Sequence, residues 1–257
     1  MIFDTHVHLN DLLFKDNYHE LIQEAIRQNI KIMAVIGFDL ESSKKAVELA
    51  KEYSFVYAVI GIHPSEQFKD YDKDLKELEK LICDKVVALG EMGLDYHYSP
   101  LDKQKQSDLF IKQLKLAKKY NLPIIIHSRD ACNDTYNILK EYKDCYQKGI
   151  MHCYSYSLEM AKEFKKLNFL FGVGGVVTYK NGKVCKEVVE GLDLTDIVLE
   201  TDAPYLPPTP FRGKVNLPEY IVYVAKEISE LKKMEVNEVE YITTKNACEF
   251  FGVTYED

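Results

Sequence analysis

The sequence predicts an α/β protein that folds as a single (β/α)8 TIM barrel over residues 1–257. Eight short apolar runs rich in β-branched side chains recur along the chain, and charged amphipathic stretches separate them. No linker or low-complexity segment interrupts the 257 residues, a length typical of one barrel of this class. Strands that alternate with helices imply a parallel sheet, and eight such units are enough to close it.

The predicted strands occupy residues 2–7, 30–36, 55–62, 86–89, 123–126, 149–152, 169–173 and 197–199. Helices are predicted where apolar residues recur at helical spacing, as Leu75, Leu78 and Ile82 do. The predicted helices include residues 75–82, 103–119, 219–232 and 237–251. The alternative fold, an open doubly wound sheet, requires a glycine-rich phosphate loop after an early strand. The glycines of GVGG at residues 172–175 come too late and lack the required spacing, so the barrel is favoured.

Composition and charge narrow the classes of function. Lys and Arg number 33 against 41 Asp and Glu, and the formal net charge of −8 argues against a protein that coats nucleic acid. An enzyme that binds a polyanion only at its active site is still possible, because bound metal ions add positive charge there. The apolar runs are too short to span a bilayer, and MIFDTHVHLN does not resemble a signal peptide. We therefore expect a cytoplasmic protein, with no membrane association and with six free cysteines.

Metal-ligand side chains occur where the predicted strands end. His6 and His8 form an HxH pair at the end of the first strand, and a spacing of two places both imidazoles on one face. The other four end the fourth, fifth, sixth and eighth strands: Glu91, His127, His152 and Asp202. In a barrel these strand ends form one ring, which carries the active site in barrel enzymes. A single strand-end histidine is more often an ordinary polar residue, but six converging positions predict a site for two divalent ions.

Three further residues are predicted to contact substrate. His63 ends the third strand, Arg129 lies two residues beyond His127, and Arg212 lies in the long connection after the eighth strand. A guanidinium at either arginine position suits bidentate phosphate binding. For Arg129 the alternative is a helix-start ion pair with Asp130 or Asp134, and for Arg212 it is a solvated loop charge.

Two carboxylates and three tyrosines have open roles. Asp4 and Glu200 lie two residues before His6 and Asp202, so each could accept a hydrogen bond from a ligand imidazole or bond within the barrel core. The tyrosines flank the ligand strands and could stack on bases or serve in packing; they are Tyr154, Tyr156 and Tyr205.

Several sequence segments occur in an order that is typical of one enzyme family. They are FDTHVHL, GIHP, GEMGLDY, PIIIHSRDA, MHCYS and LETDAPYL, followed by RGKVNLP, and they extend from residue 3 to residue 218. With these motifs the sequence resembles the TatD family of metal-dependent deoxyribonucleases, within the amidohydrolase superfamily. HxH alone would admit the whole superfamily, whereas GEMGLDY together with HSRDA and ETDAPYL is specific.

The resemblance implies a role for each of the six ligand residues. One ion would be held by His6, His8 and Asp202, and a second by His127 and His152. Glu91 would bridge the two ions, which would be Mg, Mn, Zn, Co or Ni. Asp202 and Glu91 would be the catalytic residues, with Asp202 accepting the proton of a metal-activated water.

The resemblance also implies a substrate. The expected activity is that of a phosphodiesterase on nucleic acid, a 3′–5′ exonuclease on single-stranded DNA or RNA that engages a strand end transiently. The alternative within the superfamily is hydrolysis of a small ester, lactone or phosphotriester on the same metal site. A more distant alternative is a non-catalytic metal-binding barrel. No stable protein partner is predicted.

Overall fold

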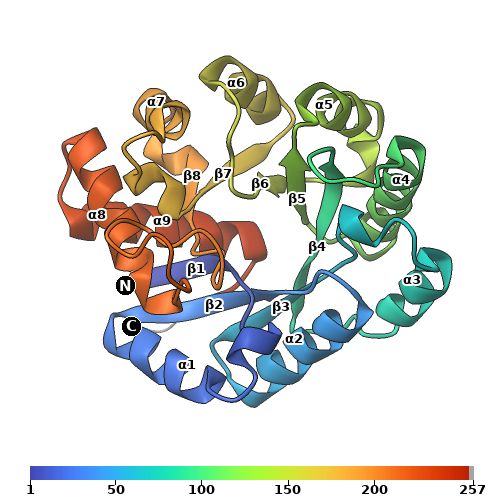
Figure 1. Cartoon of the computed structure of the whole chain (residues 1–257), viewed down its shortest axis with the longest axis horizontal. Coiled ribbons are helices and arrows are strands. Elements are labelled where there is room, and N and C mark those ends of the chain that lie inside the picture. Colours follow the sequence, from blue (N-terminus) through green and yellow to red (C-terminus); the bar gives the residue numbers. More distant parts are fainter. Residues whose placement is uncertain (255–257) are drawn as a thin grey trace.

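The computed structural model describes residues 1–254 and contains one parallel sheet of eight strands in the order β1 to β8 (Figure 1). The strands are β1 (Ile2–Val7), β2 (Ile30–Ile36), β3 (Val56–Ile60), β4 (Val86–Asp95), β5 (Ile124–Arg129), β6 (Gly149–Met151), β7 (Phe169–Val173) and β8 (Ile197–Leu199). The first and last strands of the sheet lie side by side: the hydroxyl of Thr5 in β1 donates to the carbonyl of Leu199 in β8 at 2.9 Å. This arrangement confirms the predicted (β/α)8 barrel.

The helices surround the barrel (Figure 1). They are α1 (Tyr18–Arg27), α2 (Leu40–Glu52), α3 (Tyr71–Glu79), α4 (Lys103–Tyr120), α5 (Cys132–Glu141), α6 (Leu158–Lys166), α7 (Lys183–Gly191), α8 (Ile221–Lys232) and α9 (Val236–Phe251). In α9, Phe250 and Phe251 pack against the apolar barrel interior, and the Phe251 ring lies 5.3 Å from that of Phe3. Within residues 1–254, none of these helices combines the length and the apolar character needed to cross a membrane.

Two predicted helices begin at the wrong residue. α3 begins before residue 75 because the Asp70 carboxylate accepts a hydrogen bond from the Lys73 amide at 3.2 Å and caps the helix at Tyr71. α8 begins after residue 219 because Pro218–Tyr220 forms a separate 3-10 turn.

β4 is longer than the sequence predicts. The prediction ended this strand at residue 89 and placed Glu91 at its end, whereas Glu91 lies inside a strand that continues to Asp95. Leu89 pairs with Ile124 and Met92 with Ile126, so β4 carries an extra residue between these pairs, as in a β-bulge. Two glycines, at residues 90 and 93, allow this path: Gly93 has a φ of +143°, and a Cβ there would lie 2.0 Å from the His127 carbonyl oxygen. As a result Asp95 pairs with the last residue of β5.

Candidate metal centre

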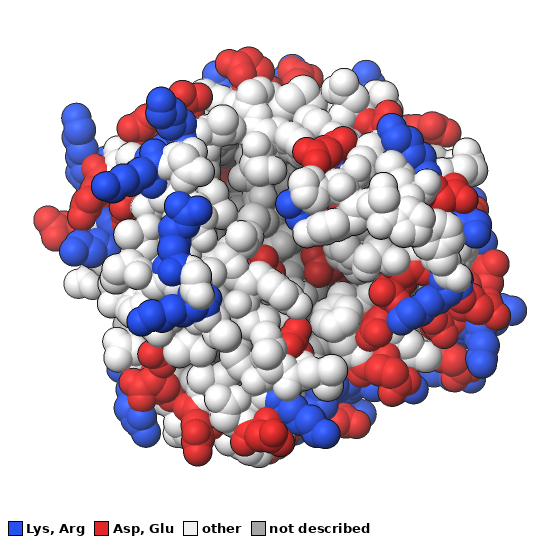
Figure 2. Space-filling view, viewed as in Figure 1, with Lys and Arg blue, Asp and Glu red and all other residues white. Residues whose placement is uncertain are grey.

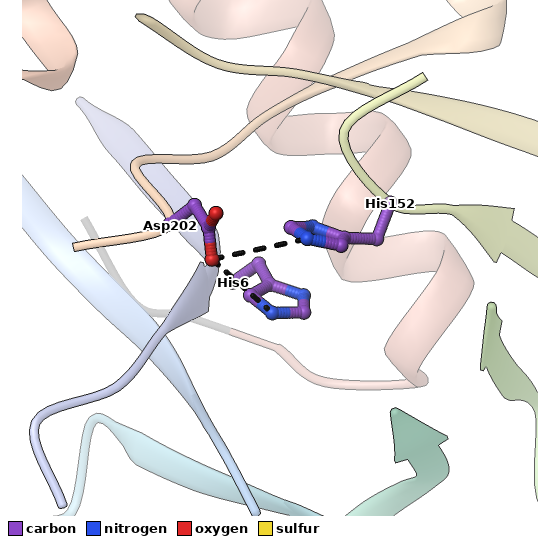
Figure 3. Close-up of side chains that lie close together, drawn as sticks. All are labelled: His6, His152 and Asp202. Carbon is purple, nitrogen blue, oxygen red and sulfur yellow. Dashed lines mark ion pairs between the residues drawn. The ribbon is translucent and has the colours of Figure 1, made fainter. Parts of the chain in front are cut away.

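Six ligand-type side chains meet at the C-terminal end of the barrel, where the sequence analysis expects them. Three lie within strands, namely His6, Glu91 and His127. His8 and His152 directly follow β1 and β6, and Asp202 lies three residues beyond the end of β8. Five of the six are at most 9% exposed, and His127 is half-buried. Figure 3 shows how His6, His152 and Asp202 point toward one another from β1 and from the segments after β6 and β8.

The Glu91 carboxylate lies among four imidazoles. Its Oε2 is 3.9 Å from His6 Nε2, 3.5 Å from His127 Nδ1 and 3.9 Å from His152 Nε2. Its other oxygen, Oε1, is 3.7 Å from His8 Nε2. Glu91 therefore belongs to two candidate ligand groups, one with His6 and His8 and one with His127 and His152. This is the position that a bridging carboxylate requires.

Asp202 reaches the same centre from the segment that follows β8. Its Oδ1 lies 3.4 Å from His8 Nε2, 3.8 Å from His6 Nε2 and 3.8 Å from His152 Nε2. Its backbone amide donates to the His6 carbonyl at 2.8 Å, which ties the segment after β8 to β1. Asp202, His6 and His152 form a third candidate group. The Asp202 carboxylate could therefore bind the same metal ion as the imidazole of His6 in β1 or that of His152 after β6.

Burial and the neighbouring carboxylates set the protonation of these groups. Burial holds the pKa of His6 well below its usual value, so its imidazole is neutral, the form that binds metals. Burial would raise the pKa of Glu91, but the hydrogen bond from His127 and the nearby imidazoles outweigh it and hold that pKa well below its usual range. Within residues 1–254, Nδ1 of the buried His6 has no hydrogen-bond partner. Burial would lower the pKa values of His8, His127 and His152, but hydrogen bonds and charges of neighbouring carboxylates outweigh it and raise all three, that of His152 to about 10. A divalent ion would therefore displace protons from these imidazoles when it binds, and four imidazoles with two carboxylates suit divalent transition ions.

Two carboxylates lie behind the ligand imidazoles. Asp95 Oδ2 is hydrogen-bonded to His127 Nε2 at 2.9 Å, and because a carboxylate can only accept, it keeps the hydrogen on Nε2 and leaves Nδ1 free for a metal. Glu200 Oε1 lies 3.1 Å from His152 Nδ1 but accepts its hydrogen bond from the Cys153 amide at 2.7 Å, and within residues 1–254 His152 Nδ1 has no hydrogen-bond partner. The sequence analysis named Glu200 for the orienting role but missed Asp95, which follows Glu91 by four residues in GEMGLDY.

Asp4 does not contact an imidazole side chain. Its Oδ2 accepts from the Thr201 hydroxyl at 2.6 Å, and its Oδ1 accepts from the Thr201 amide at 3.0 Å and from the His6 amide at 3.3 Å. For Asp4, bonding within the barrel core is therefore the correct alternative. It holds the backbone of His6 beside the segment that leads to Asp202.

A cavity of about 410 Å³ opens above the ligand residues, in the central hollow that Figure 2 shows. Of the three predicted substrate contacts, His63 and Arg129 line this cavity and Arg212 does not. Arg129 donates to the Tyr98 hydroxyl at 3.1 Å. The alternative ion pairs of Arg129 are not formed within residues 1–254, because Asp130 lies beside His97 (2.9 Å) and Asp134 accepts from Tyr96 (2.8 Å).

The three tyrosines of the sequence analysis differ in their surroundings. Tyr154 is 5% exposed and packs against Phe171, so it is a core residue. The Tyr156 hydroxyl bonds to Ser128 of β5 at 2.9 Å and accepts from the Ala131 amide at 3.2 Å, which holds the segment after β5. Tyr205 is 48% exposed and lines the cavity, so it is the one of the three that can reach a bound base.

Comparison with known proteins places this arrangement in a family. A family model described as TatD related DNase matches residues 3–252. The chain belongs to the TatD family. An uncharacterized metal-dependent hydrolase of Bacillus subtilis, YabD, is 45% identical to it over 98% of this chain and 100% of that protein. A similar protein of Mycoplasma genitalium, also described as an uncharacterized metal-dependent hydrolase, is 37% identical over 97% of this chain and 98% of its own length.

Solved structures agree with this assignment. The crystal structure of the TatD homologue YJJV from Escherichia coli matches this TatD family member with a TM-score of 0.94 and 32% identity, and covers 98% of each chain. A TatD family hydrolase from Entamoeba histolytica matches with a TM-score of 0.84 and 26% identity, again over 98% of each chain. The protein is therefore a metal-dependent hydrolase of the TatD type.

Proposed function

We propose that this TatD family member is a phosphodiesterase that removes nucleotides from the end of single-stranded nucleic acid, as a 3′–5′ exonuclease on DNA, with RNA as the second candidate substrate. The observation that carries the proposal is Arg129 at the edge of the cavity. Its side chain is held by a neutral phenol, Tyr98, rather than by a carboxylate, so its charge and its remaining N–H donors are available to a phosphate. The description of the matching family model supports the same substrate, and the polarity follows the family resemblance.

The size of the cavity supports a strand end rather than a duplex. A volume of about 410 Å³ suits one unstacked nucleotide, and Tyr205 and Tyr98 offer exposed rings on which a base can stack. The net charge of −8 also disfavours broad contact with a duplex. These features favour an enzyme that takes one terminal nucleotide at a time.

The ligand residues provide the groups that hydrolysis requires. Divalent ions held by His6, His8, Glu91, His127, His152 and Asp202 would acidify a water into a nucleophile and neutralise phosphate charge. Arg129 would hold the phosphate in position for attack. Asp202 Oδ1 faces the centre of the ligand group and would orient the attacking water and accept its proton. Asp95 would keep His127 in the orientation that directs Nδ1 to the centre.

The test is a nuclease assay on single-stranded oligonucleotides that carry a label at the 3′ end, with Mg²⁺, Mn²⁺, Zn²⁺, Co²⁺ and Ni²⁺ tried in turn. The same preparation is assayed on p-nitrophenyl esters and on bis-p-nitrophenyl phosphate. Early release of a labelled mononucleotide, abolished by chelation and by Asp202→Asn, is the expected result. Hydrolysis of carboxylic esters or lactones without any nuclease activity would support the small-ester alternative instead. Metal binding without turnover of any substrate would support the non-catalytic alternative.

A further inference from the structure

Two segments at the mouth of the barrel have an unusual charge. Residues 174–186 comprise the connection from β7 to α7 and the first turn of α7, and residues 203–218 are the part of the connection from β8 to α8 that follows Asp202. Together these two segments carry five Lys and Arg and no Asp or Glu, in a chain with 41 acidic residues. Figure 2 shows the corresponding row of Lys and Arg on one side of the central hollow, over α7 and the connection before α8 in Figure 1.

Four of these basic side chains are exposed and form what we call the basic flank: Lys180, Lys183, Arg212 and Lys214. The fifth, Lys186, forms an ion pair with Glu227 at 2.5 Å. Within residues 1–254, no carboxylate oxygen lies within 4.0 Å of a flank side chain, so its charge is not neutralised by the protein. The flank is a local positive region on an acidic protein.

The two connections are fixed to each other. The Tyr179 hydroxyl donates to the Pro207 carbonyl at 2.8 Å, and the Thr209 amide donates to the Thr178 hydroxyl at 2.8 Å. The Arg212 guanidinium lies over the Tyr179 ring, 4.2 Å from its centroid. A cation over an aromatic face keeps its N–H donors at the edge available to a ligand. Arg212 is thus packed on the Tyr179 ring and remains exposed to solvent.

The connection that carries Arg212 and Lys214 begins at the cavity. It leaves the metal centre at Asp202, passes through Tyr205 in the cavity wall and then reaches Arg212. Gly175 of the other connection packs so closely on this segment that a Cβ would lie 2.2 Å from the Leu206 carbonyl oxygen. A strand that leaves the cavity on the side of Tyr205 would therefore run along the connections that carry the flank.

We propose that the basic flank binds the phosphate backbone of the single-stranded nucleic acid that remains outside the cavity while its terminal nucleotide lies at the metal centre. This inference rests on the proposed function and adds to it a path for the rest of the strand. A row of unpaired Lys and Arg side chains can bind the regularly spaced phosphates of a nucleic acid. Such contacts do not depend on the nucleotide sequence. The flank gives an enzyme of net charge −8 a local attraction for a polyanion.

The test compares two triple variants. The flank variant is Lys180→Gln/Lys183→Gln/Lys214→Gln, which leaves Arg212 on Tyr179. The control variant, Lys51→Gln/Lys76→Gln/Lys162→Gln, removes the same charge from exposed lysines of α2, α3 and α6. Turnover is measured on a dinucleotide and on an oligothymidylate of about 20 nucleotides, which is long enough for four flank contacts. Binding of the long oligonucleotide is measured in the inactive Asp202→Asn background.

Salt dependence gives the expected size of the effect. With four phosphate contacts at a slope of about −0.7 each, binding of the long strand should weaken roughly 50-fold as salt rises from about 50 to 200 mM, but only roughly threefold in the flank variant. The flank variant should also lose kcat/KM on the long substrate and not on the dinucleotide, whereas the control variant should match the wild type on both.

The outcomes separate the two proposals. If the wild type cleaves neither substrate, the proposed function fails. If the wild type is an exonuclease and the flank variant keeps the wild-type salt slope and kcat/KM on the long strand, the function stands and the flank inference is wrong. Binding to phosphatidylserine vesicles is measured as well. A flank variant that loses only vesicle binding would assign the flank to a membrane surface and overturn the inference.

Discussion

The contact between Asp95 and His127 makes a prediction that does not depend on the substrate. Both oxygens of the Asp95 carboxylate are used: Oδ2 lies 2.9 Å from His127 Nε2, and Oδ1 accepts from the His97 amide at 2.9 Å. Asp95→Asn keeps the shape but must turn an NH2 group toward one of these donors. When the NH2 faces His127, Nε2 becomes an acceptor and the imidazole hydrogen moves to Nδ1, the atom that lies 3.5 Å from Glu91 Oε2. The metal centre then loses a coordinating nitrogen, because Nδ1 cannot bind an ion while it carries a hydrogen.

The expected effect of Asp95→Asn is a roughly 10- to 100-fold loss of metal affinity, or about 1.4–2.7 kcal/mol. Calorimetric titration of the metal-stripped protein with Mn²⁺ or Co²⁺ measures it, and the visible spectrum of bound Co²⁺ reports the change in ligands. Asp134→Asn is the matched control, since this carboxylate accepts from the Tyr96 hydroxyl, which lies outside the ligand group. Metal affinity and spectrum within twofold of the wild type would refute the orienting role of Asp95.

Four further changes test the metal centre and the cavity. Asp202→Asn should leave the fold intact and remove most hydrolysis, because an amide cannot take the proton of the attacking water; near wild-type turnover with full metal loading would contradict this role. Arg129→Ala should lower kcat/KM on phosphodiesters by roughly 10- to 100-fold without changing metal content, as expected for the loss of a charged hydrogen bond of about 1.5–3 kcal/mol. Equal losses on a neutral ester would show that Arg129 is structural. Addition of metal at about 100 times Kd should stabilise the stripped protein by about 2.7 kcal/mol and raise Tm by roughly 5–11 °C in calorimetry. Glu91→Gln should lose most of that shift, and an unchanged shift would exclude Glu91 as a ligand.

The barrel was predictable because its strands are apolar and β-branched and its helices amphipathic. The ligand group was predictable because His6, His8, His127 and His152 fall at the C-terminal ends of β1, β5 and β6. The end of β4 was not predictable in this way, because GEMGLD has neither an apolar run nor a strict alternation. The bulge and the two glycines extend the strand, and only that extension brings Asp95 beside His127.

Spacing alone could not separate Asp4 from Glu200. Both precede a ligand residue by two positions, and both are completely buried. Their partners differ because Thr201 presents its amide and hydroxyl to Asp4, whereas Glu200 faces the imidazole of His152. The basic flank was missed for a related reason. Net charge is a sum over the whole chain, and the potential at the mouth of the barrel depends on which side chains the two connections bring together.

A single strand shows how sequence alternation builds this site in layers. Along β5, Ile125, His127 and Arg129 share one face, because side chains two residues apart point the same way. Ile125 is 1% exposed and belongs to the apolar interior, His127 is half-buried at the metal centre, and Arg129 is exposed at the cavity rim. From core to solvent, the strand thus carries an apolar core residue, a metal-ligand residue and the residue proposed to bind phosphate. A one-residue insertion between Ile125 and His127 would turn the ligand and the arginine to the opposite face together, whereas an insertion after Arg129 would leave all three in place. The metal site and the proposed phosphate site are therefore coupled through the register of β5.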